Sequence, residues 1–309
     1  MKLTCGKVLP QRAKSDAIKQ ILIAGGMHEI ATYSFISSKA ADTLRLPEDD
    51  DRRRAVRLLN PLGEEYSTLR TQLTTSMLTV LATNFSRKIP AARLFELSKR
   101  FEPKQLPVTE QPLELPVLSL GLYGKEEDFF TLKGLVEQVF ALFGITPKYE
   151  RAEEPYLHPG RQAAALLGAT RLAVLGEVHP DVADDYGLGE RTYVAEIELT
   201  PLFALKQPIV LYQPLPRFPA VERDLALLCD DTLPVAEIEH AIRKSAGKLL
   251  ESVELFDVYR GAQIAEGKKS VAYSLFFRKA DGTLSDAELE PVLDKVFAAL
   301  QKIGCTLRT

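Results

Sequence analysis

Cysteine is scarce in this chain of 309 residues: Cys5, Cys229 and Cys305 lie far apart and form no C-x-x-C pair. An odd number of isolated cysteines argues against a disulfide scaffold or a zinc cluster and is typical of a reducing cytoplasm. The four histidines show neither i,i+4 spacing nor an H-E-x-x-H motif. We therefore expect no metal site and a cytoplasmic location.

Long apolar runs are also missing. No segment approaches the roughly 18 apolar residues that a membrane span needs. Residues 1–7 carry charge but no apolar stretch long enough for export. The sequence thus predicts a soluble protein with no membrane partner.

Charge of one sign is not in large excess. The chain has 39 basic and 42 acidic side chains, a net charge of -3, so any nucleic acid must be held by local patches. Hydrophobic residues make up 46% and charged residues 26%, the ordinary mixture of a globular protein. At about 150 residues per domain, the length favours two domains.

Motifs for catalysis are absent as well. The sequence has no G-x-x-x-x-G-K-[ST] loop, no G-x-S-x-G elbow and no G-x-G-x-x-G after a strand. The acidic residues 48–51 are followed at once by arginines 52–54, which we interpret as a solvated, self-neutralising loop. We expect no catalytic residue in this chain.

The HPGR segment at residues 158–161 leaves two alternatives open. His158 and Arg161, held on a rigid turn, could orient a phosphate or a carboxylate. Alternatively, His158 caps the turn and Arg161 pairs with Glu153 or Glu154.

Proline marks the domain boundary. Four prolines between residues 206 and 219 favour an extended connector, so we place domains at 1–213 and 214–309. In the first domain, the patterns predict an α+β fold with an antiparallel sheet. The expected helices are 15–24 capped by Ser15, 74–85, and 131–143 capped by Thr131; the expected strands are 29–35, 93–97, 162–167, 171–178 and 193–199.

The second domain has a cleaner pattern. Its elements are expected at 224–229 (strand), 234–246 (helix), 251–259 (strand), 270–278 (strand), 285–302 (helix) and 305–308 (strand). This βαββαβ order is the ferredoxin-like arrangement.

Several segments, taken together and in order, resemble the β subunit of bacterial phenylalanyl-tRNA synthetase. In the first domain they are NPLGEEYSTLR (60–70), LFELSK (94–99), DFFTLKG (128–134), LHPGR (157–161) and LGEVHP (175–180). In the second domain they are PRFPAVERDL (216–225), LFDVYRG (255–261) and GKKS (267–270). One departure is Ser98, which stands where the family usually has glycine.

The resemblance implies a first domain with the class II synthetase fold but without its catalytic motifs, followed by a ferredoxin-fold anticodon-binding domain. It also implies an α subunit that holds ATP and phenylalanine, and tRNA(Phe) as a partner. ATP and magnesium would be used by the α2β2 holoenzyme, with no cofactor in this chain. The family's tRNA-binding and editing domains would lie upstream. We expect an exposed apolar surface on the first domain where the α subunit docks.

The strand at 270–278 suggests where RNA binds. Val271, Tyr273, Leu275 and Phe277 form one face, which we expect to pack on the helices. The other face carries Phe276 for stacking on a base and Arg278 for a phosphate or base contact. Further expected RNA contacts are Arg217, Arg223, Tyr259, Arg260, Lys268 and Lys269. The alternative is that Arg223 and Arg278 merely pair with Asp224 or Asp257.

Alternative functions remain open at this point. A self-contained transferase would need a catalytic constellation, and none is found. A stand-alone RNA-binding module with an interaction scaffold is the milder alternative. Residues 214–309 contain 13 Lys and Arg against 15 Asp and Glu, so we expect weak RNA binding by this domain alone.

Overall fold

The computed structural model describes residues 6–206, 211–212, 214–261 and 264–308. The chain divides into two compact units, Met1–Ile209 and Val210–Thr309, with the boundary beside the cut placed at residue 213. Within the described residues, no helix has the length and apolar character needed to cross a membrane.

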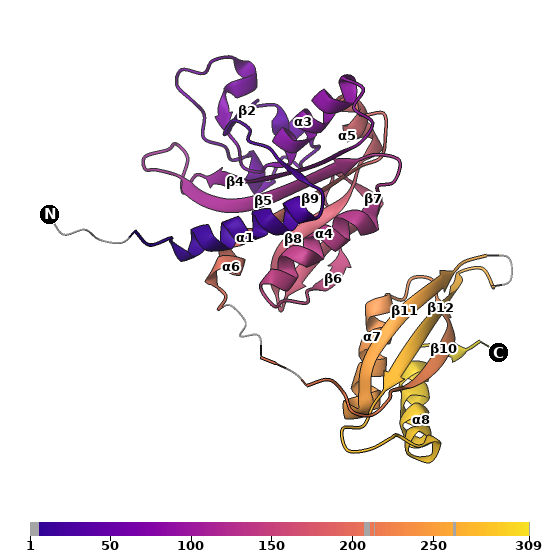
Figure 1. Cartoon of the computed structure of the whole chain (residues 1–309). Coiled ribbons are helices and arrows are strands. Elements are labelled where there is room, and N and C mark those ends of the chain that lie inside the picture. Colours follow the sequence, from indigo (N-terminus) through magenta and orange to yellow (C-terminus); the bar gives the residue numbers. More distant parts are fainter. Residues whose placement is uncertain (1–5, 207–210, 213, 262–263, 309) are drawn as a thin grey trace. The chain divides into compact units, whose positions relative to one another are not determined.

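The first unit is built on a seven-stranded sheet with the order β1-β4-β5-β9-β8-β7-β6 (Figure 1). Its strands are β1 (His28–Glu29), β4 (Ala92–Glu102), β5 (Leu113–Tyr123), β6 (Lys148–Arg151), β7 (Leu157–Leu167), β8 (Thr170–Val178) and β9 (Thr192–Glu198). β1 pairs with β4 in parallel, whereas the other neighbours are antiparallel. The sheet is therefore mixed, which corrects the predicted antiparallel sheet. A long crossover separates β1 from β4, so the chain can return in the same direction.

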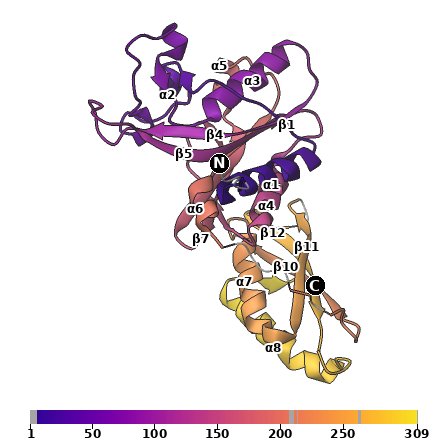
Figure 2. The ribbon, with the colours of Figure 1, turned by 60° about the vertical axis from the view of Figure 1, so that its left-hand side comes forward.

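Helices cover both faces of this sheet. They are α1 (Pro10–Ala24), α2 (Ala40–Thr43), α3 (Thr74–Ser86), α4 (Phe129–Leu142), α5 (Pro180–Asp185) and α6 (Leu199–Ala204), with short 3-10 turns at η1 (Asp51–Arg53) and η2 (Glu64–Tyr66). α1 and α4 lie on one face, and α3 and α5 lie on the other (Figure 2). Leu22 and Phe140 belong to the core under α1 and α4, while Met77 and Leu81 belong to the core under α3. Because both faces are covered, the sheet contributes side chains to two apolar cores.

The predicted strand at residues 29–35 is wrong. The structure has instead β1 and a separate strand β2 (Phe35–Ile36), which pairs with β3 (Thr68–Leu69) in a small second sheet. Between them, the backbone N–H of Thr32 donates to Glu96 Oε1 at 3.2 Å, and its hydroxyl donates to Oε2 at 2.6 Å. A buried carboxylate thus takes the place of a strand partner, and no local pattern reveals it.

Two predicted helix caps are also wrong. α1 begins at Pro10, which needs no N–H in the first turn, and Ser15 lies inside the helix with its hydroxyl donating to Gln11 O. α4 is capped by Asp128, whose Oδ1 accepts from the Thr131 backbone N–H at 2.7 Å. Thr131 is a residue type that often caps helices, but Asp128 takes the cap position here because its carboxylate accepts two hydrogen bonds from Thr131.

The second unit is a four-stranded antiparallel sheet with the order β11-β12-β10-β13. Its elements are β10 (Val221–Asp230), α7 (Val235–Ala246), η3 (Gly247–Leu249), β11 (Leu250–Tyr259), β12 (Lys268–Phe277), α8 (Asp286–Lys302) and β13 (Thr306–Leu307). The βαββαβ order agrees with the ferredoxin-like prediction.

The alternation along β12 is confirmed. Val271, Tyr273, Leu275 and Phe277 are all fully buried, and they share a core with Ile238 and Ile242 of α7 and with Val296 and Leu300 of α8. Since both helices pack on this face, no helix among the described residues of the second unit covers the opposite face of the sheet.

Candidate functional site

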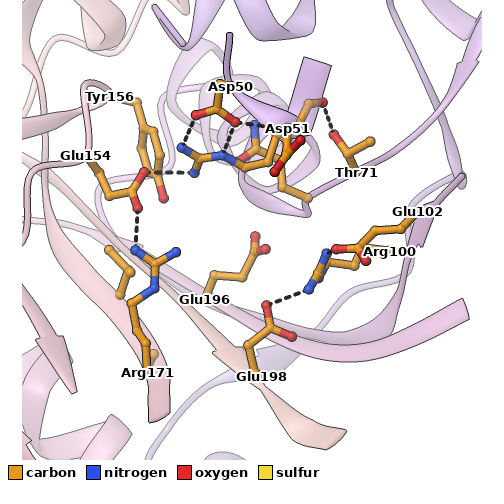
Figure 3. Close-up of a pocket in the computed structure, with 14 residues that line it drawn as sticks. Asp50, Asp51, Thr71, Arg100, Glu102, Glu154, Tyr156, Arg171, Glu196 and Glu198 are labelled. Carbon is orange, nitrogen blue, oxygen red and sulfur yellow. Dashed lines mark hydrogen bonds and ion pairs between the residues drawn. The ribbon is translucent and has the colours of Figure 1, made fainter. Parts of the chain in front are cut away.

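A polar cavity of about 410 Å³ opens in the first unit (Figure 3). Its walls come from the turn around η1, the segment before α3, strands β4, β8 and β9, and the segment before β7. Its lining residues are Asp50, Asp51, Arg52, Thr71, Gln72, Arg100, Glu102, Glu154, Tyr156, Arg171, Ala173, Val174, Glu196 and Glu198. These residues lie far apart in the sequence, and only the sheet order and the η1 turn bring them together.

Arg52 is the centre of one charged group in this cavity. Its guanidinium donates to Asp50 and to Glu154, each at 2.7 Å, and Arg171 donates to the other oxygen of Glu154 at 3.1 Å. Burial acts to lower the pKa of Arg52, but the hydrogen bond to Asp50 and the charge of Glu154 outweigh it and raise that pKa above its usual value. Arg52 is thus a half-buried ion, which the interpretation as a solvated loop did not predict. The rest of the segment agrees with that interpretation, because Glu48, Asp49, Asp51 and Arg54 are exposed.

Glu196 lies between the charged groups of the cavity (Figure 3). Its Oε2 accepts hydrogen bonds from Leu73 N at 2.8 Å and from Thr74 N at 3.1 Å, at the start of α3. Burial raises the pKa of this carboxyl, although the hydrogen bond from Leu73 opposes the rise. The side chain therefore holds the helix start in place and also faces the cavity.

Two of the sequence motifs meet in a second, fully buried pair. Arg70 has no exposed surface, and its guanidinium donates to Glu96 at 3.1 Å. It also donates to Lys99 O at 2.9 Å and to the hydroxyl of Ser98, the residue that stands in place of the usual glycine. Arg70 thereby connects the segment 60–70 to strand β4, which gives the NPLGEEYSTLR and LFELSK motifs a structural role.

The HPGR turn follows the structural alternative. His158 Nδ1 accepts from the backbone N–H of Gly160 at 3.0 Å, so the histidine caps its own turn. Arg161 pairs with Glu177 through two hydrogen bonds of 2.5 and 2.8 Å, rather than with Glu153 or Glu154. Glu177 lies on β8, and its position opposite the bulged start of β7 could not be inferred from sequence distance.

On the second unit, the uncovered sheet face has two unlike ends. Phe276 lies opposite Glu222 on β10, and the neighbouring Ser274 lies between Asp224 and Glu254. The expected aromatic platform is thus surrounded by carboxylates. Arg278, at the end of the same strand, donates to Glu251 at 2.6 Å and to Phe218 O.

The other end of this face carries an aromatic residue beside a cation. The guanidinium of Arg308 lies 5.8 Å from the ring centroid of Tyr259 and donates to Ser270 Oγ at 3.4 Å. Arg308 makes no ion pair with a carboxylate of the described residues. Sequence reasoning missed it, although its position next to a short terminal strand was a usable signal.

The remaining expected RNA contacts are dispersed. Arg260 pairs with Asp231 at 2.6 Å, and Lys268 lies 3.8 Å from Asp230. Arg217 is exposed in the connector.

Two residues do not lie where an RNA contact needs them. Lys269 is 4% exposed and donates to the carbonyls of Asp231 and Leu233, so it stabilises a turn instead of lining the rim. Arg223 points to the helix side of the sheet, like Leu225 and Leu227 on the same strand. There it pairs with Asp286 at the start of α8. Its partner is thus neither Asp224, which is adjacent in the sequence, nor Asp257 on β11.

Comparisons with known proteins identify both units. A family model described as "Phenylalanyl tRNA synthetase beta chain CLM domain" matches residues 1–199. The chain belongs to the phenylalanyl-tRNA synthetase beta chain family. A second model, "Ferredoxin-fold anticodon binding domain", matches residues 216–308.

Relatives of the phenylalanyl-tRNA synthetase beta chain family align with almost the whole chain. It is 44% identical over 306 residues to a phenylalanine–tRNA ligase beta subunit of Clostridium tetani, covering 98% of this chain and 38% of that protein. It is 42% identical over 305 residues to that of Symbiobacterium thermophilum, covering 95% of this chain and 34% of that protein. The chain thus spans little more than a third of the length of these relatives.

The site of this beta-chain family member offers binding and positioning chemistry. Within the described residues, no group of three or more His, Cys, Asp or Glu side chains could hold a metal ion. The arginines of the cavity are paired with carboxylates, and none is joined to a nucleophile.

Proposed function

We propose that this chain acts as part of the β subunit of phenylalanine–tRNA ligase, in which it supports the catalytic α subunit and binds tRNA(Phe). The observation that carries the proposal is the joint match of both units to the domains of one subunit. In this proposal the α subunit holds ATP and magnesium, the holoenzyme works in the cytoplasm, and this chain alone is inactive.

The first unit serves in this proposal as a class II synthetase-like scaffold. One hollow of about 830 Å³ has a partly apolar lining that includes Tyr33, Phe35 and Tyr66. Tyr33, which lines it, is 70% exposed and contacts Tyr66 edge-to-face, and Leu59 and Leu62 in the preceding loop are 98% and 90% exposed. Exposed apolar side chains are typical of protein interfaces, which supports docking of the α subunit on this part of the first unit.

The second unit binds the tRNA through its uncovered sheet face. We place the main base contact at Tyr259, beside Arg308, and a weaker one at Phe276. The reason is electrostatic, because Glu222, Asp224 and Glu254 near Phe276 repel the phosphates of an incoming strand. Stacking of a base on an aromatic side chain contributes about 1–3 kcal/mol.

Reconstitution of the full chain with the α subunit of the same genome tests the proposal. In the complex, Tyr259→Ala should weaken tRNA(Phe) affinity about ten-fold or more, and Phe276→Ala should weaken it less. Lys295→Ala, an exposed change on α8 at the helix side, is the matched control and should leave affinity unchanged. Affinity can be measured by filter binding at a fixed salt concentration.

Two results would contradict the proposal. If the full chain forms no complex with the α subunit, the scaffold role fails. If the complex forms but Tyr259→Ala and Phe276→Ala both bind tRNA as well as Lys295→Ala does, this sheet face has only a structural role.

A further inference from the structure

The cavity of the first unit contains more carboxylates than its arginines neutralise. Its lining includes three arginines and six carboxylates. Arg52 and Arg171 pair with Asp50 and Glu154, and Arg100 lies between Glu102 and Glu198. The exposed Asp51 pairs with Arg54, which is not part of the lining. The ion pairs thus leave a net negative charge inside a partly enclosed space, which is unfavourable unless a cation is present.

Glu196 is the carboxylate that these pairs leave over. It makes no ion pair with a described residue, and all three of its hydrogen bonds, from Leu73 N, Thr74 N and Thr74 Oγ1, fall on Oε2. No described group donates to Oε1. Figure 3 shows the side chain extending into the space between Arg171 and Arg100. Oε1 is therefore an acceptor available to a molecule in the cavity.

Gln72 gives a second, independent sign of a ligand. The residue is only 4% exposed, and it lines the same cavity. The amide forms no hydrogen bond with any described residue. The amide atoms are not fully enclosed by protein, so they are open to a molecule in the space that Gln72 lines. This amide offers an acceptor oxygen and a donor N–H to a polar ligand.

We propose that this cavity binds a small organic cation carrying a primary ammonium group, which donates to Glu196 Oε1 and to the Gln72 amide oxygen. The net negative lining disfavours an anion. A quaternary ammonium lacks the N–H donors that the two acceptors require. A bare metal ion fits less well, because the described residues bring no three metal-ligating side chains together. This proposal does not depend on the tRNA ligase function.

The test is calorimetric titration of the full chain with putrescine. We expect one putrescine per chain to bind at the cavity. Butane-1,4-diol, which has the same carbon chain without charge, and tetramethylammonium, which has charge without N–H donors, should not bind. No putrescine binding at millimolar concentration overturns the proposal, and equal binding of either comparison molecule overturns its chemistry.

Variants locate the site. Glu196→Gln should weaken putrescine binding about ten-fold or more, because it removes a charge-assisted hydrogen bond. Glu196 also holds the start of α3, so Gln72→Met serves as a second variant that leaves those hydrogen bonds in place. Glu114→Gln, an exposed carboxylate on β5 paired with Lys99, is the matched control and should bind as the unchanged chain does. Unaltered binding by both cavity variants would overturn the location.

Discussion

The cavity of the first unit and the open sheet face of the second are both made largely from strand side chains, but their charged side chains differ in burial and pairing. In the cavity, Arg52 and Glu154 are largely buried and pair across distant segments, although Arg171, the second partner of Glu154, is exposed. On the open face, charged groups lie on a solvated surface and alternate with small residues. Burial makes the first network part of the fold's stability, whereas the second surface is free to serve a partner.

Breaking the buried pair Arg70–Glu96 inside the first unit should give the largest loss of stability. Arg70→Met should lower the free energy of unfolding by about 3–5 kcal/mol, because it leaves the Glu96 carboxylate, 3% exposed, without a counter-charge. Lys99→Met breaks an exposed pair with Glu114 and should cost at most about 1 kcal/mol. Denaturant unfolding of the full chain, followed in the first unit, measures both. Equal losses would remove the distinction between buried and exposed charge.

The second largest difference in stability is expected between two neighbouring positions on β12. Leu275→Ala should destabilise the second unit by about 2–5 kcal/mol, because it leaves a hole in a fully buried core. Phe276→Ala, on the opposite face with no helix above it, should cost clearly less. Hydrogen exchange at the amides of β10 and β12 in the full chain reads out both variants. A comparable loss in the two variants would mean that the open face is packed against something.

The smallest expected effect concerns a surface carboxylate at the start of α8. A hydrogen bond from Lys279 and two from Ser285 lower the pKa of Glu288 to about 2. Because the folded pKa is depressed, the stabilisation is present above the unfolded pKa and is lost as pH falls toward 2. The melting temperature of the second unit should thus fall less steeply between about pH 5 and pH 3 in Glu288→Gln than in the control Glu290→Gln. Identical slopes would contradict this assignment.

Local patterns in the sequence were sufficient for much of the second unit. The two-residue period of 270–278 predicted which side chains pack on the helices, and Val271, Tyr273, Leu275 and Phe277 are buried as expected. The order of elements also followed from the sequence, because each strand and helix there has its own period and its own turns. The same reasoning predicted α3, which begins at Thr74 as expected.

What the sequence by itself determined is therefore the type and order of most elements, the inward face of β12 and the resemblance carried by its motifs. Only the tertiary structure decided the partners of the charged residues: Arg70 with Glu96, Arg161 with Glu177, Arg223 with Asp286 and Arg52 with Glu154. It also decided that Lys269 is buried and that Glu196 and Gln72 share a cavity. The physical reason is that periodicity follows from local backbone geometry, whereas an ion pair depends on which strands become neighbours in the sheet.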